Sequence, residues 1–229
     1  MSKILHIGIP SKGRLRKDIL KTFKNNNLTL ISERGERDLL GSIKQLKNTK
    51  ILYLHAREII ERLGDGSLDL GFSGFDLLKE SQIIVQNKIN VIKKYSFGRA
   101  NLVVAIPDPW IDVQTVADLE EIAFQFKENK KKRLRVATKY PNLTKEFLFS
   151  KGVTQFKLVD SLGATEAYPF IGSSEIITDI TSTGETLRAN NLRILKDGEI
   201  LKSEACMMVS KSSINKINLK KVIKLLSKN

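Results

Sequence analysis

Short apolar runs alternate with amphipathic segments along most of this 229-residue chain. The runs are rich in β-branched residues and predict buried strands at 4–9, 51–54, 68–72, 101–106, 134–138, 156–160 and 175–180. Apolar side chains recurring every three or four positions predict helices around 15–23, 56–63, 119–126 and 219–226. Thr115 and Asp118 form a capping-box pattern before the third helix. This alternation favours an α/β fold with mainly parallel sheets, covered by helices on both faces.

Two extended runs suggest where the chain passes between two lobes. The first spans 96–106, and the second spans 192–209 and is broken by the turn-like Lys196-Asp197-Gly198. If both cross the same gap, the first lobe is discontinuous, 1–103 plus 195–229, and 104–194 forms the second lobe. Two lobes joined by paired crossing strands leave a cleft between them, where small molecules usually bind.

The chain is strongly basic, with a formal net charge of +14. A nucleic-acid ligand is one interpretation of this charge. However, the lysines are spread along the chain, and only Lys130-Lys131-Lys132-Arg133 forms a tight run, between a predicted helix and a predicted strand. No helix-turn-helix, zinc-finger or RNA-binding aromatic pattern accompanies it. We therefore expect a solvated connection there and no nucleic-acid partner, and small polyanionic substrates account for part of the charge.

No segment of the sequence indicates export or membrane insertion. No apolar run approaches the ~20 residues of a membrane span, and the first ten residues lack the length and cleavage site of a signal peptide. The single cysteine, Cys206, lies in an apolar run, so no internal disulfide is possible and a small buried side chain is expected. We expect a soluble, cytoplasmic protein without membrane contacts.

The stretch from 175 to 188 carries the most specific chemistry. A β-branched run ends near Asp179 and gives way to Ser182, Thr183, Gly184 and Thr186, after which a helix-like segment begins. Backbone N–H groups and hydroxyls at the start of a helix can hold a phosphate. The Asp179 carboxylate could accept hydrogen bonds from sugar hydroxyls, which suggests a phosphorylated sugar. The alternative is a capped helix without a ligand.

A second polar segment, Lys12-Gly13-Arg14, directly follows the first predicted strand. The carboxyl edge of a parallel sheet is where ligands bind in α/β folds. Gly13 would let the backbone approach an anion, and Arg14 can bind two oxygens at once. The alternative is a polar connection that begins the next helix.

Two further strand ends are candidates. Gly71, Gly74 and Asp76 could admit a flat ligand such as a purine, or they could serve packing and helix capping alone. Lys139 and Tyr140 could face the cleft, or they could form a turn capped by Asn142.

Taken together, these segments resemble the ATP phosphoribosyltransferase family. The motifs are Pro-x-Lys-Gly-Arg-Leu, Asp-Leu-Gly-x-x-Gly-x-Asp, Phe-Gly-Arg, Arg-Val-Ala-Thr-Lys-Tyr-x-Asn-Leu and Asp-Ile-Thr-Ser-Thr-Gly-x-Thr-Leu, in that order between residue 4 and about 211. The resemblance implies two periplasmic-binding-protein-like (type II) lobes. It also implies a pentosyltransferase that commits ATP and phosphoribosyl pyrophosphate to histidine biosynthesis. The length resembles the family's short form, which works as a homodimer within a hetero-oligomer containing a regulatory subunit related to histidyl-tRNA synthetase.

The resemblance also implies roles for individual residues. Asp179 and Glu166 would bind ribose hydroxyls or the associated metal. Lys139 would lie at the substrate. The 5′-phosphate would be held by Ser182, Thr183, Gly184, Glu185 and Thr186. The pyrophosphate and ATP phosphates would meet Lys12, Gly13 and Arg14, and the nucleotide would lie beside Gly71, Gly74 and Asp76.

One departure concerns the segment after the third strand of the family pattern. Many members carry Arg-Ala-x-Asp there, with the arginine near the phosphates, whereas this chain reads His55-Ala56-Arg57-Glu58. Either His55 makes a weaker contact, Arg57 reaches in from the next turn, or a neighbouring subunit contributes. A strand-end histidine with no ligand is the alternative.

The implied reaction needs no side-chain nucleophile. The adenine N1 of ATP would displace pyrophosphate at C1 of the ribose, with Lys12 and Arg14 as the catalytic cations and Mg²⁺ carried by substrate phosphates. No dedicated metal motif is therefore expected. A small-anion solute-binding protein or a ligand-sensing module of the same fold is the alternative function, although neither requires the loop after Asp179.

Overall fold

The computed structural model describes residues 4–31 and 39–227. The chain divides into two compact units, residues 1–98 with 204–229 and residues 99–203. The second unit is thus inserted into the first in sequence. This unit extends further in both directions than the expected 104–194, because the two extended runs pair with each other inside its sheet.

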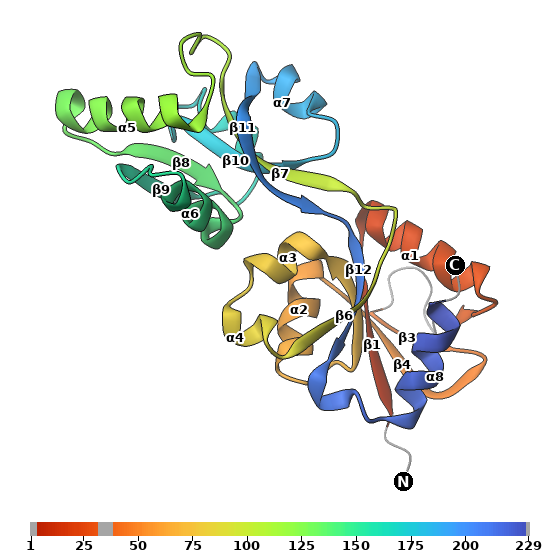
Figure 1. The fold of residues 1–229 in the computed structure, drawn as a ribbon. Coiled ribbons are helices and arrows are strands. Elements are labelled where there is room, and N and C mark those ends of the chain that lie inside the picture. The colour runs from red at the N-terminus through yellow and green to blue at the C-terminus, as the bar shows by residue number, and fades with distance from the viewer. Residues whose placement is uncertain (1–3, 32–38, 228–229) are drawn as a thin grey trace. The chain divides into compact units, whose positions relative to one another are not determined.

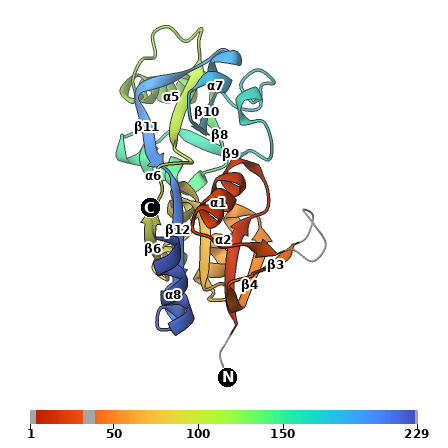
Figure 2. The same cartoon turned by 90° about the vertical axis from the view of Figure 1, so that its right-hand side faces the viewer.

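The first unit is built on a seven-stranded sheet with the order β2-β3-β4-β1-β5-β12-β6. Its strands are β1 (Leu5–Pro10), β2 (Leu30–Ile31), β3 (Leu40–Ile43), β4 (Leu46–Leu54), β5 (Leu70–Gly74), β6 (Ile89–Lys94) and β12 (Ala205–Ser210). Its helices are α1 (Gly13–Asn25), α2 (Ala56–Gly64), α3 (Phe75–Glu80), α4 (Ile83–Gln86) and α8 (Ile217–Leu226), with a 3₁₀ turn η2 (Lys211–Ser213). Figure 2 shows β3 and β4 toward one side of this sheet and β12 and β6 toward the other.

Helices cover both faces of the first sheet. Alternate residues of β1, β5 and β12 pack with α1 and α8 around Phe23 and Phe72. The opposite face packs against α2 and α3, around Ile59 and Met208. Figure 1 shows α1 and α8 on one side of the sheet and α2, α3 and α4 on the other. Cys206 is fully buried in the second of these clusters, which confirms the expected small buried side chain.

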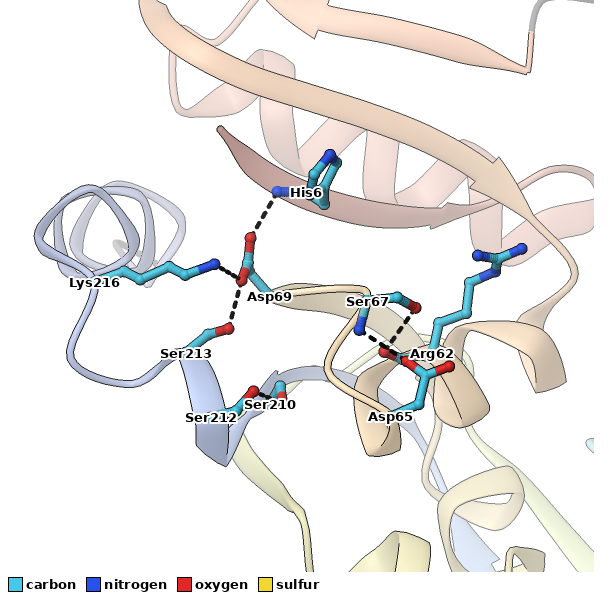
Figure 3. Close-up of polar contacts among 9 residues, drawn as sticks. All are labelled: His6, Arg62, Asp65, Ser67, Asp69, Ser210, Ser212, Ser213 and Lys216. Carbon is cyan, nitrogen blue, oxygen red and sulfur yellow. Dashed lines mark hydrogen bonds and ion pairs between the residues drawn. The ribbon is translucent and has the colours of Figure 1, made fainter. Parts of the chain in front are cut away.

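A buried carboxylate fastens α8 to the amino edge of this sheet (Figure 3). Asp69, immediately before β5, accepts hydrogen bonds from the His6 backbone N–H at 2.8 Å and from the Ser213 hydroxyl, and Lys216 Nζ lies 2.5 Å from it. Its side chain is 2% exposed. Burial alone would raise the pKa of Asp69, but the bonds from Lys216, Ser213 and His6 together lower it below its usual range. The first aspartate of the Asp-Leu-Gly motif thus has a structural role.

The second unit is built on a five-stranded sheet with the order β11-β7-β10-β8-β9. Its strands are β7 (Ala100–Pro107), β8 (Leu134–Thr138), β9 (Phe156–Asp160), β10 (Ile176–Thr181) and β11 (Leu192–Ser203). Its helices are α5 (Val116–Lys130), α6 (Pro141–Ser150) and α7 (Glu185–Ala189), with a 3₁₀ turn η1 (Thr165–Ala167). One face packs against α5 and α6, and the other packs against Leu187 of α7 and Tyr168.

The strands and helices expected from the sequence are present, but the sheets are mixed rather than mainly parallel. β12 runs antiparallel to β5 and β6, and β7 runs antiparallel to β10 and β11. The segment 196–198 does not break the second extended run, because β11 continues through it with register shifts between Ile194 and Leu201.

Two smaller expectations are confirmed. The Thr115–Asp118 capping box begins α5 with both reciprocal hydrogen bonds. The basic run 130–133 is exposed between α5 and β8. Within residues 4–31 and 39–227, no helix combines the length and apolar character needed to cross a membrane.

Candidate functional site

Three neighbouring parallel strands bring the candidate residues of the first unit to one sheet edge. β1 pairs in parallel with β4 on one side and with β5 on the other. The carboxyl ends of these strands therefore lie side by side. The Ser11 N–H donates to the Leu54 carbonyl at 2.8 Å, which ties the loop after β1 to the end of β4. The expected site residues of this unit lie at these ends or just after them, namely Lys12, Arg14, His55, Gly74 and Asp76.

The loop after β1 presents exposed cations on a short turn. Lys12 is the N-cap of α1, and Arg14 is in its first turn. Gly13 has a φ of +84°, and a side chain there would meet nothing within 4 Å. The glycine is therefore required by its left-handed backbone and leaves the loop open to an approaching anion. No acidic residue lies in the first turn of α1 to neutralise this end.

His55 caps the helix that follows β4. Its Nδ1 accepts a hydrogen bond from the Arg57 N–H at 3.3 Å, and both side chains are exposed. His55 therefore has a structural role as the N-cap of α2, which was not among the expected roles. Whether His55 or Arg57 also contacts a phosphate stays a prediction.

The two glycines of β5 have different structural roles. A Cβ on Gly71 would lie 2.5 Å from Ile59 Cγ2, so this glycine lets β5 pack closely on α2. Gly74 is the N-cap of α3, and a Cβ there would collide with the Asp76 carboxylate. Packing explains Gly71, whereas Gly74 allows the buried Asp76 side chain to fold back over the strand end.

In the second unit, the loop after β10 is a preformed turn. The Thr181 hydroxyl accepts the Gly184 N–H at 2.9 Å, and Gly184 has a φ of +74°. The Ser182 hydroxyl donates to the Arg99 carbonyl at 3.1 Å, within the Phe-Gly-Arg motif. Thr183, Glu185 and Thr186 are exposed around this turn.

One cation at this loop was not among the expected site residues. Arg188 of α7 folds back and donates to the Thr183 carbonyl at 3.1 Å. Its Nη1 would lie 2.9 Å from a Cβ on Gly184. An arginine one helical turn beyond the glycine was the available signal in the sequence.

Asp179 is half-buried at the carboxyl end of β10, beside two other expected residues. Burial raises the pKa of its carboxyl. The Ile180 N–H, which donates to Asp179 Oδ1 at 2.8 Å, opposes this shift, as does the nearby Lys139. Glu166 raises the pKa further, and the Thr165 hydroxyl donates to Asp179. The structure therefore brings Asp179, Lys139 and Glu166 together.

Tyr140 is not one of the accessible side chains beside Asp179. Its side chain is 6% exposed, and it is the N-cap of α6, with Pro141 at the first helical position. The alternative of an Asn142 cap is wrong, because Asn142 lies within the helix.

The charged groups around Asp179 fit a metal ion that arrives with a substrate. Among residues 4–31 and 39–227, no group of three or more His, Cys, Asp or Glu side chains is placed to hold a metal ion. Glu166 lies close enough to Asp179 to raise the pKa of the Asp179 carboxyl. Mg²⁺ commonly takes only one or two protein carboxylates and completes its shell with phosphates and water. Two carboxylates match that requirement.

Known proteins resemble this chain over most of its length. The HisG family model, described as ATP phosphoribosyltransferase, matches residues 55–228. An ATP phosphoribosyltransferase from Nitrobacter winogradskyi is 46% identical over 93% of this chain and 66% of its own length. One from Mesorhizobium japonicum is 41% identical over 92% of this chain and 91% of its own length. The chain thus spans slightly less than two thirds of the length of several relatives that it matches.

Solved structures resemble the chain as well. An ATP phosphoribosyl transferase (HisG:HisZ) complex from Thermotoga maritima has a chain that is 25% identical, with a TM-score of 0.75, covering 97% of this chain and 96% of that one. The arginine-, lysine-, histidine-binding protein ArtJ from Geobacillus stearothermophilus matches at 12% identity with a TM-score of 0.55, covering 97% of this chain and 88% of that one, which indicates a shared periplasmic-binding-protein-like fold alone. On the family match and the relatives together, the chain belongs to the ATP phosphoribosyltransferase family.

Proposed function

We propose that this protein transfers the 5-phosphoribosyl group from phosphoribosyl pyrophosphate to N1 of ATP. The products are phosphoribosyl-ATP and pyrophosphate, in the first step of histidine biosynthesis. The observation that carries the proposal is the loop after β10 in a chain of this family, where a hydroxyl-rich turn follows directly on Asp179. The proposal includes a cytoplasmic location.

The second unit binds the phosphorylated ribose in this proposal. The exposed hydroxyls of Thr183 and Thr186 and the backbone of the turn from Ser182 to Thr186 hold the 5′-phosphate, and Arg188 supplies a positive charge beside them. The Asp179 carboxylate accepts hydrogen bonds from the ribose hydroxyls, with Glu166 nearby. A carboxylate here also favours the positive character that develops at C1 as the leaving group departs.

The first unit serves ATP and the leaving pyrophosphate. Lys12 and Arg14 sit on the open turn after β1, where two cations can offset the charge that accumulates on pyrophosphate. Gly74 and Asp76, at the neighbouring strand end, lie beside the nucleotide. Catalysis then consists of aligning two polyanions and stabilising the leaving group.

Mg²⁺ bound to substrate phosphates would neutralise part of the charge of the pyrophosphate. The side chains that would hold it are Asp179 and Glu166, which also orient the ribose. Lys139 nearby offsets part of the negative charge of Asp179.

We also propose that the chain works as the short, catalytic form of the family. The solved complex from Thermotoga maritima pairs such a chain with HisZ, and its matching chain is covered over 96% of its length. A homodimer within a hetero-oligomer, together with a regulatory subunit related to histidyl-tRNA synthetase, is the corresponding assembly here.

Thr186→Ala tests the phosphate loop. Loss of one hydrogen bond to a charged phosphate costs about 1.5–3 kcal/mol, so the Kd for phosphoribosyl pyrophosphate should rise about 10- to 150-fold. Stability should hold, because Thr186 is exposed in α7 and alanine favours helix. Isothermal titration calorimetry measures the change. Thr154→Ala, at an exposed position outside the loop, is the matched control and should bind as the wild type does. Equal affinity of T186A and wild type would remove Thr186 from the site.

The function itself is tested by incubating the chain with ATP, phosphoribosyl pyrophosphate and Mg²⁺, with and without a HisZ-type subunit, and following product absorbance. Product that requires both substrates supports the proposal. Ligand binding without turnover under both conditions would instead favour a solute-binding or ligand-sensing module.

A further inference from the structure

Three buried threonine hydroxyls form a closed ring in the second unit. Thr178 Oγ1 donates to Thr138 Oγ1 at 2.6 Å, and Thr144 Oγ1 lies 3.2 Å from Thr138 Oγ1 and 2.6 Å from Thr178 Oγ1. The side chains come from β8, α6 and β10, and none is more than 1% exposed. We call these three side chains the hydroxyl ring.

Three hydroxyl protons are available in the ring, and each can donate one of the three hydrogen bonds within it. Each hydroxyl carries a single proton. Because Thr178 donates to Thr138, the three contacts are all satisfied when Thr138 donates to Thr144 and Thr144 donates to Thr178. The Tyr140 backbone N–H adds a further bond to Thr138 Oγ1 at 2.9 Å. The cluster is therefore fully satisfied in a buried environment, which fixes its geometry closely.

The ring sits directly behind the charged group of the candidate site. Thr138 and Thr178 are register partners on adjacent parallel strands, and Lys139 and Asp179 are the next residues along the chain. Successive side chains of a strand point to opposite faces. The ring thus lies on the face covered by α6, while Asp179 points to the other face, where it interacts with Lys139.

A purely apolar core would not need this arrangement. The same face of the sheet is otherwise packed by aliphatic side chains such as Val136, Ile176 and Leu148. Buried hydroxyls add directional bonds that a valine at the same place cannot make. Directional bonds fix the relative height of two strand ends, whereas aliphatic packing tolerates small shifts.

We propose that the hydroxyl ring positions Asp179 and Lys139 for binding phosphoribosyl pyrophosphate. Thr138, Thr144 and Thr178 are positioning residues, since none of them reaches the substrate side of the sheet. The inference rests on the proposed function, because it assigns the ring to the site that this function uses. Removing one hydroxyl lets the ends of β8 and β10 shift against each other and misplaces both charged side chains.

Thr144 offers the sharpest test, because it lies on α6 and adjoins no expected site residue in the sequence. Thr144→Val removes the hydroxyl and keeps the shape, whereas Thr144→Ser keeps the hydroxyl and removes a methyl group. Thr49→Val is the control for losing a buried threonine hydroxyl elsewhere, since Thr49 Oγ1 donates to the Leu46 carbonyl in the first unit. The measurements are the Kd for phosphoribosyl pyrophosphate by calorimetry, the KM values for both substrates, and thermal unfolding.

T144V is expected to raise the Kd and KM for phosphoribosyl pyrophosphate about 10-fold and to leave the KM for ATP within about 2-fold. T144S should restore the wild-type values, and T49V should lose stability without a change in Kd. Unchanged binding in folded T144V, or equal defects in T144V and T144S, would overturn the inference while leaving the proposed function standing. If the wild type binds the ligand but forms no product, the proposed function fails and the calorimetric comparison still decides on the ring. A wild type that binds no phosphoribosyl pyrophosphate would overturn both.

Discussion

Replacing Asp179 with asparagine is expected to lower kcat/KM for phosphoribosyl pyrophosphate about 10- to 150-fold and to make the protein more stable at neutral pH. The kinetic loss follows from removing a charged hydrogen-bond acceptor of the ribose, which is worth about 1.5–3 kcal/mol. The gain in stability arises because burial and the nearby Glu166 disfavour the ionised form of Asp179 in the folded protein. A neutral asparagine removes this cost. Residues whose removal stabilises a fold and impairs its activity mark functional sites.

The stability gain should depend on pH in a defined direction. The pKa of Asp179 is raised in the folded protein, so the wild type binds more protons when folded than when unfolded. Its stability relative to Asp179→Asn is therefore greatest at acid pH and declines as pH rises through the folded pKa. Thermal unfolding between pH 4 and pH 8 measures this difference. The range begins at pH 4 because the usual carboxyl pKa is about 4.

Asp112→Asn is the matched control for this substitution. It makes the same chemical change at an exposed position of the second unit. It should leave both the kinetics and the pH dependence of unfolding unchanged. An Asp179→Asn variant that loses stability and keeps its activity would show that Asp179 serves the fold rather than the substrate.

Asp69→Asn is expected to destabilise the protein by about 3 kcal/mol without altering the substrate KM values. All three partners of the Asp69 carboxylate are donors: the His6 N–H, the Ser213 hydroxyl and Lys216 Nζ. An amide would place its own NH₂ group where the carboxylate now accepts a hydrogen bond, and it would leave Lys216 without a counter-charge. Breaking a buried ion pair costs about 3–5 kcal/mol, and the lower value applies because Lys216 is partly exposed.

Chemical denaturation at several pH values measures this effect. The folded Asp69 has a lowered pKa, so its contribution is present above the unfolded carboxyl pKa of about 4 and is lost as pH falls through the folded pKa. The difference in free energy of unfolding between wild type and Asp69→Asn should therefore become smaller at acid pH. Asp65→Asn is the control in the neighbouring exposed turn, where Oδ1 accepts the Ser67 N–H at 2.8 Å and an amide oxygen can replace it (Figure 3). An Asp69→Asn variant that is as stable as the wild type, or one with altered KM values, would contradict the role of Asp69 in holding α8 to the sheet.

Local order was predictable where the signal repeats along the chain. The buried runs gave β8 and β9 with the bounds expected. The apolar stripe that follows Asp118 gave α5, because propensity, cap and periodicity agree there. Strand direction was not predictable in the same way. β12 and β7 are apolar runs like those of parallel strands, and their antiparallel pairing depends on partners more than 50 residues away.

The candidate site was predictable to the level of segments. The segments after β1, β4, β5 and β10 were expected from polar residues at strand ends, and three of those strands prove to be neighbours in one sheet. The interactions of Asp69 and of the hydroxyl ring were not predictable, because each joins elements that only the tertiary structure brings together. Gly71 shows the same limit, since its packing on Ile59 depends on the position of α2.

The most direct measurement is the identity and amount of product formed by the purified chain, with its HisZ-type partner present, from ATP and phosphoribosyl pyrophosphate. Mass spectrometry and ³¹P NMR of one reaction give both quantities. The account predicts an adduct of ATP with one phosphoribosyl group, formed in equal amount to the pyrophosphate released and strongly reduced in Asp179→Asn. Pyrophosphate release without the adduct, or no reaction of either substrate, would contradict it.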